Sequence, residues 1–170
     1  MPQPTPIPGR PLPDFALTLA DGGTLPLVAP GWRLLVIFRG AHCPMCEAFL
    51  SKAEEQRQSY DEAGIALVLA TADPADRAAA FLSRTGYRGR VAAGLTLEQM
   101  TQLGLHITQP DGTGASQPFA EPAAFATDDH GRLHLVQIGN APYARPDLAA
   151  LLAGLVYDRS NAIPARGGGA

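Results

Sequence analysis

One short segment constrains the fold of this chain more than any other. It is the apolar run "RLLVIF" at 33–38, which precedes the only two cysteines of the chain by a few residues. A run without alternating polar residues is typical of a strand that is covered on both faces. The segment from Pro44 to about Ala63 then has the spacing of an amphipathic helix. A covered strand that leads directly into a helix predicts an α/β fold.

The same alternation of strands and helices continues along the chain. A hairpin is predicted around Asp21-Gly22-Gly23, and the polar segment 105–121 is expected to be a long loop. Asp73 is expected to cap a helix that ends near Thr85. Further strands are expected at 65–71, 90–95, 123–127 and 132–138, and further helices at 97–103 and 147–157. This order predicts a three-layer α/β sandwich, with a mixed central sheet and an N-terminal β-hairpin.

Length and composition fit a single domain. The 170 residues are 46% hydrophobic and 17% charged, which is typical of globular chains. The proline-rich residues 1–13 are expected to form an extended arm. Residues 14–158 are expected to form the folded domain, and residues 159–170, which include three consecutive glycines, a flexible tail.

Charge and hydropathy argue against two classes of partner. The formal net charge is −3 and no basic patch is present, so nucleic acid is not expected as a partner. No apolar stretch has the length that a bilayer span requires, so no membrane is expected either. The opening segment lacks the apolar centre of a secretory signal, and a cytoplasmic location is therefore expected. In that reducing compartment, a close cysteine pair is more often catalytic or metal-binding than structural.

The spacing of Cys43 and Cys46 indicates thiol redox chemistry. Cys43 would lie exposed at the start of the helix, where free N–H groups and the macrodipole favour a thiolate. Pro44 suits the first helical turn, because the N–H group that it lacks has no partner there. Cys46 would lie one turn further, where it can attack a sulfenic acid or a disulfide on Cys43. Cys43 is therefore the expected nucleophile and Cys46 the expected resolving thiol.

Other interpretations of the pair stay open. The two thiols could be inert buried side chains. A structural zinc site would need four ligands, but His42, Cys43 and Cys46 could bind Cu(I), which needs fewer. His42 could instead assist proton transfer, or lie beside the site without a role. No glycine-rich phosphate loop follows a strand, so no cofactor is expected.

The segment "VIFRGAHCPMC" resembles a known motif. It is similar to that of the peroxiredoxin-like proteins of the alkyl hydroperoxide reductase / thiol-specific antioxidant (AhpC/TSA) family in the thioredoxin superfamily. That motif has an apolar strand, Tyr-Arg-Gly, two residues and Cys-Pro-x-Cys. The segments "PAAFATDDHGRLHLVQIG" and "GNAPYARPDLAALL" are also similar to this family, and the likeness covers most of residues 11–155.

The resemblance implies a thioredoxin-like fold and reduction of peroxides or disulfides, with a thioredoxin-type dithiol reductant as partner. It implies an active-site role for Arg145; Arg39 is a second cation that could lower the pKa of Cys43. Pro122 stands where thioredoxin-like proteins carry a cis-proline, and an ordinary trans proline is the alternative. The oligomeric state stays open, with a homodimer among the options.

Two positions depart from the family pattern. Gly40 stands where typical peroxiredoxins carry a threonine whose hydroxyl helps to orient the peroxide. His42 replaces the usual aromatic residue. Two enzymatic hypotheses follow. The first is a peroxidase in which Cys46 resolves Cys43, and the second is a thiol–disulfide reductase without a peroxidase step.

Overall fold

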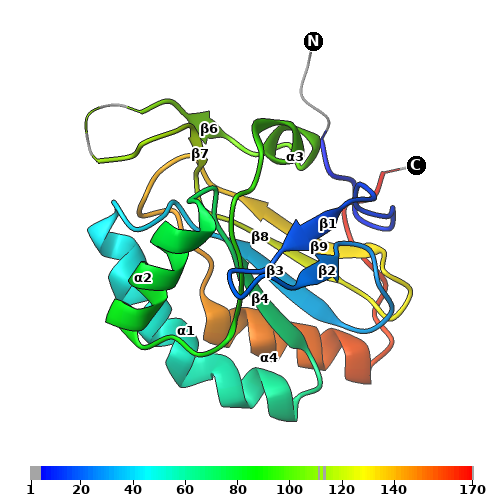
Figure 1. Cartoon of the computed structure of the whole chain (residues 1–170). Coiled ribbons are helices and arrows are strands. Elements are labelled where there is room, and N and C mark those ends of the chain that lie inside the picture. The colour runs from blue at the N-terminus through cyan, green and yellow to red at the C-terminus, as the bar shows by residue number, and fades with distance from the viewer. Residues whose placement is uncertain (1–4, 111, 113, 170) are drawn as a thin grey trace.

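A five-stranded sheet forms the centre of the computed structural model, which describes residues 5–110, 112 and 114–169 (Figure 1). The strand order is β5-β4-β3-β8-β9. β3 pairs in parallel with β4, and β4 with β5, whereas β8 runs antiparallel to both β3 and β9. The mixed sheet predicted from the sequence is thus confirmed. Its strands are β3 (Arg33–Ile37), β4 (Ala66–Ala70), β5 (Arg90–Ala92), β8 (Ala123–Thr127) and β9 (Leu133–Ile138).

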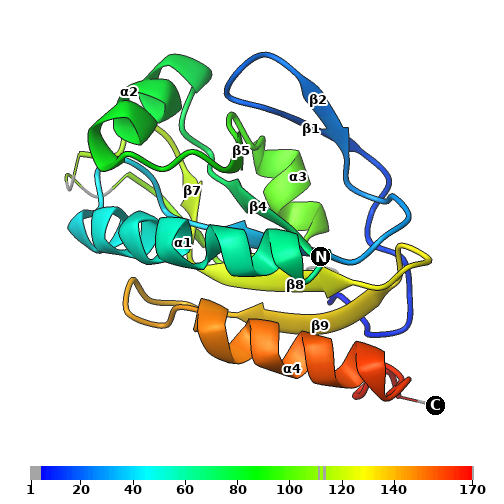
Figure 2. The same ribbon diagram turned by 90° about the horizontal axis from the view of Figure 1, so that it is seen from below.

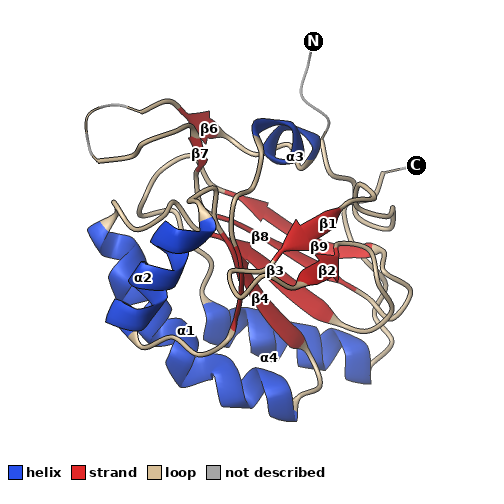
Figure 3. Cartoon of the chain, viewed as in Figure 1, coloured by secondary structure: helices blue, strands red, loops and turns tan. Residues whose placement is uncertain are grey.

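Helices pack on both faces of this sheet, which gives the predicted three layers (Figure 2). The helices α1 (Pro44–Glu62), α2 (Ala75–Thr85) and α4 (Leu148–Ser160) share one buried apolar cluster with one face of the sheet. On the other face lie the short helix α3 (Leu97–Gln102) and the hairpin of β1 (Ala16–Thr18) and β2 (Thr24–Pro26). Figure 3 distinguishes the helices and strands by colour.

The strand β3 explains why "RLLVIF" is apolar throughout. Leu34 and Val36 belong to the cluster under α1, α2 and α4, whereas Leu35 and Ile37 belong to the cluster on the opposite face. Alternate residues of a strand point to opposite faces, so both sets must be apolar where both faces are covered. The central strand therefore leads the chain directly from the core into the loop before α1.

The helix α1 has the predicted start and the predicted buried stripe. Pro44 is its first residue, and Phe49, Ala53 and Tyr60 are buried along one side. The Tyr60 hydroxyl donates a hydrogen bond to the backbone carbonyl of Leu148 at 2.7 Å, which connects α1 to the first residue of α4.

The prediction that Asp73 caps α2 was wrong. The helix begins at Ala75 with Pro74 as its N-cap residue. The Asp73 carboxylate instead accepts a hydrogen bond from the Ala41 N–H at 2.7 Å. A buried carboxylate needs a hydrogen-bond donor as a partner. For Asp73 this donor is Ala41, 32 positions earlier in the chain, so the local sequence could not reveal it.

The prediction of an irregular loop over 105–121 was partly wrong. This segment contains β6 (Ile107–Thr108) and β7 (Phe119–Ala120), which pair antiparallel. Strands of two residues are too short for hydrophobic alternation to reveal them. The pairing places the end of the segment beside the cysteines, as described below.

Both expected boundaries of the folded domain differ in detail from the structure. The Gly9 N–H donates to the Leu133 carbonyl at 2.7 Å, and the Leu133 N–H donates to the Arg10 carbonyl at 2.8 Å, so part of the expected arm borders β9. The helix α4 extends past the expected end at 157 to Ser160.

Some sequence-based expectations cannot be compared with the fold. Residues 1–4 of the arm, Asp111 and Thr113 of the loop, and Ala170 of the tail lie outside the described residues. Over the residues that are described, no helix has the length and apolar character needed to cross a membrane.

Removal of the Tyr60 hydroxyl tests the contact between α1 and α4. Tyr60→Phe keeps the buried ring but deletes a buried hydrogen bond, so we expect the free energy of unfolding to fall by about 1 kcal/mol. Urea denaturation measures this change. The matched control is Tyr157→Phe, because the Tyr157 side chain is 61% exposed and its variant should unfold like the original. Equal urea midpoints of unfolding for the original chain, Tyr60→Phe and Tyr157→Phe would contradict the expectation.

Candidate active site

The loop after β3 places Cys43 at the start of α1. Cys43 is the N-cap residue of this helix, and its N–H donates to the Gly40 carbonyl at 3.2 Å. The Cys46 N–H donates to the Cys43 carbonyl at 3.0 Å, so Cys46 lies within the first turn. The predicted position of the pair, at a strand-to-helix junction, is confirmed. Pro44, the first helical residue, is exposed.

Both cysteines are buried and carry free thiols. Cys43 is 3% exposed and Cys46 is 0% exposed. The expectation that Cys43 lies exposed at the helix start was therefore wrong. The sequence could not reveal this burial, because a side chain from 102 positions further along the chain covers the two sulfurs.

That side chain is Arg145, from the segment before α4. Its Nη2 atom donates to Cys43 Sγ at 3.3 Å and to Cys46 Sγ at 3.4 Å, and its Nη1 atom donates to Cys46 Sγ at 3.4 Å. The guanidinium also lies 5.7 Å from the centre of the Phe49 ring. One guanidinium therefore contacts both sulfurs.

A second arginine, Arg39, also contacts Cys43. Its Nη1 atom donates to Cys43 Sγ at 3.6 Å. Its Nε atom forms an ion pair of 3.1 Å with Oε2 of Glu121, and its guanidinium lies 4.8 Å from the centre of the Phe119 ring. Cys43 is thus in contact with two cations.

These contacts make the two thiols chemically unequal. The pKa of Cys43 is lowered, chiefly because the Cys46 thiol donates a hydrogen bond to its sulfur, and also because Arg39 and Arg145 favour the negative charge. Burial opposes this shift. The pKa of Cys46 is raised, because its proton is held by Cys43 and because burial disfavours a second thiolate. The two shifts favour a thiolate at Cys43 and a protonated thiol at Cys46.

Gly40 fills a position where no larger residue fits. Its φ angle is +137°, and a Cβ atom there would lie 2.6 Å from Oδ2 of Asp73. This is the same carboxylate that accepts the Ala41 N–H, and Arg77 Nε lies 3.6 Å from its other oxygen. The space next to Gly40 is therefore occupied by a carboxylate from the neighbouring strand end.

His42 packs against the ring of Phe119, with 4.5 Å between the ring centres. Both of its ring nitrogens are buried and lack a hydrogen-bond partner among the described residues. Burial lowers the pKa of His42, so the ring is mainly neutral at neutral pH. Across the described ranges, no group of three or more His, Cys, Asp or Glu side chains could hold a metal ion, and His42 does not form such a group with the two cysteines.

Pro122 is buried at the start of β8, and the Gly139 N–H donates to its carbonyl at 2.8 Å. The peptide bond before it is trans, since the described part of the chain contains no cis peptide bond. Its link to the cysteines is indirect and runs through its neighbour Glu121, which pairs with Arg39.

Sequence reasoning missed four residues of this site. Asp73 was predicted to cap a helix, and Thr108, Phe119 and Glu121 were predicted to lie in a loop. Thr108 belongs to the site through its hydroxyl, which donates to Oε1 of Glu121 at 2.6 Å. One signal was present in the sequence: Glu121 is the only charged residue between Phe119 and Thr127. A lone acidic residue in an apolar stretch indicates a buried charge that needs a cationic partner.

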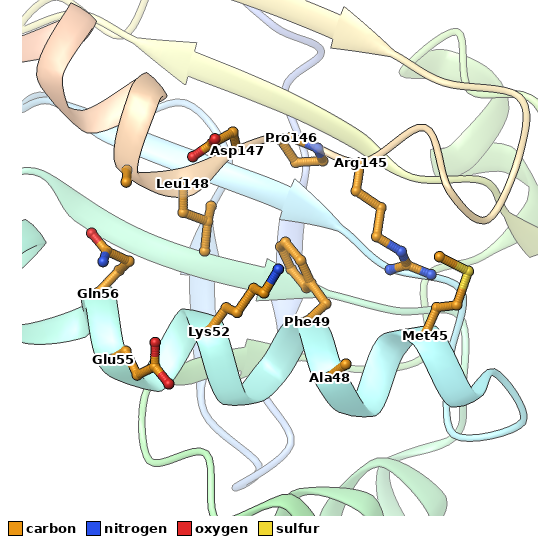
Figure 4. Close-up of a pocket in the computed structure, with 11 residues that line it drawn as sticks. Met45, Ala48, Phe49, Lys52, Glu55, Gln56, Arg145, Pro146, Asp147 and Leu148 are labelled. Atoms are coloured by element: carbon orange, nitrogen blue, oxygen red, sulfur yellow. The ribbon is translucent and has the colours of Figure 1, made fainter.

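A groove of about 460 Å³ opens beside Arg145, between α1 and the start of α4 (Figure 4). Met45 and Arg145 lie at the end near the cysteines, and the Phe49 ring lies in its middle. The Lys52 side chain reaches into it from α1. The groove therefore leads from solvent to the guanidinium that contacts both sulfurs.

Comparison with known families agrees with this arrangement. The family model Redoxin matches residues 7–152, most of the chain. The chain belongs to the Redoxin family. It is a thiol-based oxidoreductase of peroxidase-like type, and the peroxiredoxin-like resemblance of its sequence is confirmed. A comparison with curated proteins gave no match.

Solved structures show the same thioredoxin-like fold. A peroxiredoxin-like protein from Aquifex aeolicus superposes with a TM-score of 0.76 and 18% identity, over 92% of this chain and 90% of that one. The AhpC of Enterococcus faecalis superposes with a TM-score of 0.75 and 14% identity, over 94% of this chain and 95% of that one. A thiol peroxidase from Chromobacterium violaceum superposes with a TM-score of 0.71 and 18% identity, over 92% of this chain and 90% of that one.

Substitution of Gly40 tests the tight contact with Asp73. Gly40→Ala adds a Cβ atom to a strained backbone conformation and against a buried carboxylate, so we expect a loss of roughly 1–3 kcal/mol in the free energy of unfolding. The control is Gly154→Ala, because Gly154 lies within α4 with no atom near its would-be Cβ, and alanine should stabilise the helix there. A Gly40→Ala variant as stable as Gly154→Ala would contradict the geometry.

Substitution of Arg145 tests its electrostatic effect on Cys43. Arg145→Gln removes a cation that favours the thiolate, so we expect the pKa of Cys43 to rise. Each unit of rise lowers the thiolate fraction roughly tenfold at a pH below the pKa. The rate of Cys43 alkylation as a function of pH measures this effect. Arg10→Gln, at an exposed position, serves as the control. Identical profiles for the two variants would rule out the assigned effect.

Proposed function

We propose that the chain reduces peroxides, with Cys43 as the nucleophile and Cys46 as the resolving thiol. The observation that carries this proposal is the inequality of the pair. Cys43 accepts hydrogen bonds from Arg39 and Arg145. The pKa of Cys43 is lowered, which favours its thiolate, whereas the pKa of Cys46 is raised. A thiolate is the form that attacks a peroxide.

In the first step the Cys43 thiolate attacks one oxygen of the peroxide. The sulfur–oxygen bond forms as the oxygen–oxygen bond breaks, and the sulfur is oxidised to a sulfenic acid while the peroxide is reduced. The second oxygen leaves as an alkoxide or hydroxide and takes a proton from water. The arginines favour this step, because guanidinium N–H groups stabilise negative charge as it moves from sulfur to oxygen.

In the second step Cys46 attacks the Cys43 sulfur. The Cys46 thiol loses its proton, a disulfide forms, and the sulfenic oxygen leaves as water. Cβ atoms three residues apart on a helix lie roughly 5–6 Å from each other, and a disulfide needs about 3.5–4.5 Å. Cys43 has a non-helical backbone (φ −102°, ψ 112°), so it can move towards Cys46 without disruption of α1.

The proposed cycle closes with an external reductant. The disulfide accepts two electrons from a dithiol donor of the thioredoxin type, which becomes a disulfide in turn. A reducing cytoplasm would supply such a donor, and we place the reaction there.

Gly40 favours a second candidate function, thiol–disulfide reduction. The position carries no hydroxyl that could orient a peroxide, and the Asp73 carboxylate takes its space. The same pair can reduce a disulfide substrate, because Cys43 would form a mixed disulfide that Cys46 then resolves.

Single-cysteine variants test the proposed cycle. Cys43→Ser should abolish donor-coupled peroxide consumption. Cys46→Ser should still consume about one equivalent of peroxide per chain and stop at a sulfenic acid that a dione reagent traps. Peroxide consumption by Cys43→Ser at the original rate would exclude the mechanism.

A rate comparison on one preparation of the original chain separates the two functions. Turnover with peroxide and turnover with a protein disulfide are measured with the same donor. If turnover with the protein disulfide is much faster than turnover with peroxide, thiol–disulfide reduction replaces peroxide reduction as the proposed function.

A further inference from the structure

We propose that Glu121 is a positioning residue that sets the reactivity of Cys43 by holding Arg39 against its sulfur. This inference rests on the proposed role of Cys43 as the nucleophile. Glu121 does not contact either cysteine; it acts through Arg39, whose two ends touch the carboxylate and the sulfur.

Glu121 is a buried carboxylate with a hydrogen bond at one oxygen and an ion pair at the other. It is 5% exposed. Its Oε1 atom accepts a hydrogen bond from the Thr108 hydroxyl at 2.6 Å, and its Oε2 atom lies 3.1 Å from Arg39 Nε. A carboxylate removed from water is costly unless it is paired, so this arrangement strongly disfavours movement of either partner.

Arg39 is held at three places. Glu121 pairs with its Nε edge, the Phe119 ring lies under its face at 4.8 Å, and Nη1 points to Cys43 Sγ at 3.6 Å. A guanidinium is planar, so a contact at its edge together with one on its face determines the direction of its remaining N–H groups. Without the carboxylate, the long arginine side chain is free to turn away from the sulfur.

The segment predicted as a loop supplies this support. Thr108 and Phe119 are opposite each other in the β6–β7 pair, and the Glu121 N–H donates to the His106 carbonyl at 2.9 Å. The pairing of two short strands therefore brings the hydroxyl, the ring and the carboxylate together near Arg39. The β6–β7 pair therefore borders the candidate active site.

Glu121 has two opposing effects on the Cys43 thiolate. Its negative charge disfavours the thiolate, whereas its hold on Arg39 favours it. The other groups that face Cys43 are Cys46 from α1, His42 from the loop and Arg145 from the segment before α4. None of them is changed by a substitution at position 121, so variants of Glu121 can separate contact from charge.

The experiment compares Glu121→Asp with Glu121→Gln in the full chain. Aspartate keeps the charge but is one methylene shorter, so its oxygens withdraw from Arg39. Glutamine keeps the reach and an acceptor oxygen but has no charge. We expect Glu121→Asp to lower the rate of Cys43 alkylation by iodoacetamide roughly tenfold at a pH below the Cys43 pKa, as for a rise of one pKa unit. Glu121→Gln should keep the original rate or exceed it.

A matched set of controls shows whether the effect passes through Arg39. In an Arg39→Gln background, Glu121→Asp should have no further effect on alkylation, since coupled residues are not additive. Glu98→Gln, on the exposed side of α3, should leave the rate unchanged. Circular dichroism monitors folding in each variant, and a purely structural role would alter stability without a shift in the pH profile.

Three results would overturn the proposal. The first is a rate of Cys43 alkylation in Glu121→Asp that equals the rate in the original chain. The second is a fall in this rate on Glu121→Asp substitution that is as large in the Arg39→Gln background as in the original chain. The third is a fall in the rate in Glu121→Gln that is as large as that in Glu121→Asp. Alkylation requires neither peroxide nor a donor. A positive result here with no peroxide turnover would therefore refute the proposed function and leave the role of Glu121 standing.

Discussion

The contact of one guanidinium with two sulfurs is the interaction on which this site depends. Arg145 donates to both Cys43 and Cys46, which are almost fully buried. A thiolate in such a place would be strongly disfavoured without a nearby cation and hydrogen-bond donors. The helix start alone would not suffice, because burial removes the water that normally solvates the charge. The position of the segment before α4 is thus as important for the chemistry as α1 itself.

Two buried carboxylates support the groups around Cys43. Glu121 pairs with Arg39, and Asp73 binds the Ala41 N–H and lies near Arg77. Each carboxylate comes from a different strand end and satisfies a group that the loop before Cys43 would otherwise leave without a partner. These contacts connect the loop around Cys43 to two strand ends. It also explains why Gly40 carries no side chain, since Asp73 already occupies that space.

The elements of the fold that come from strong local patterns were predicted well. The uniformly apolar "RLLVIF" became the central strand β3, and the stripe of Phe49, Ala53 and Tyr60 became the buried side of α1. Weak or local signals misled the prediction. Asp73 next to Pro74 resembles a helix cap, but its carboxylate found a partner 32 positions earlier in the chain. The strands β6 and β7 have two residues each and carry no detectable period.

The sequence by itself determined the chemistry of this protein: two cysteines three residues apart at the start of a helix, after a buried strand. That information is local, because helix geometry alone relates Cys43 to Cys46. Only the tertiary structure decided how reactive each thiol is. Arg145, Glu121 and Asp73 are brought to the pair by strand pairing and helix packing. The pKa of a buried group depends on the charges that surround it in space, and neighbours in space are not neighbours in the chain.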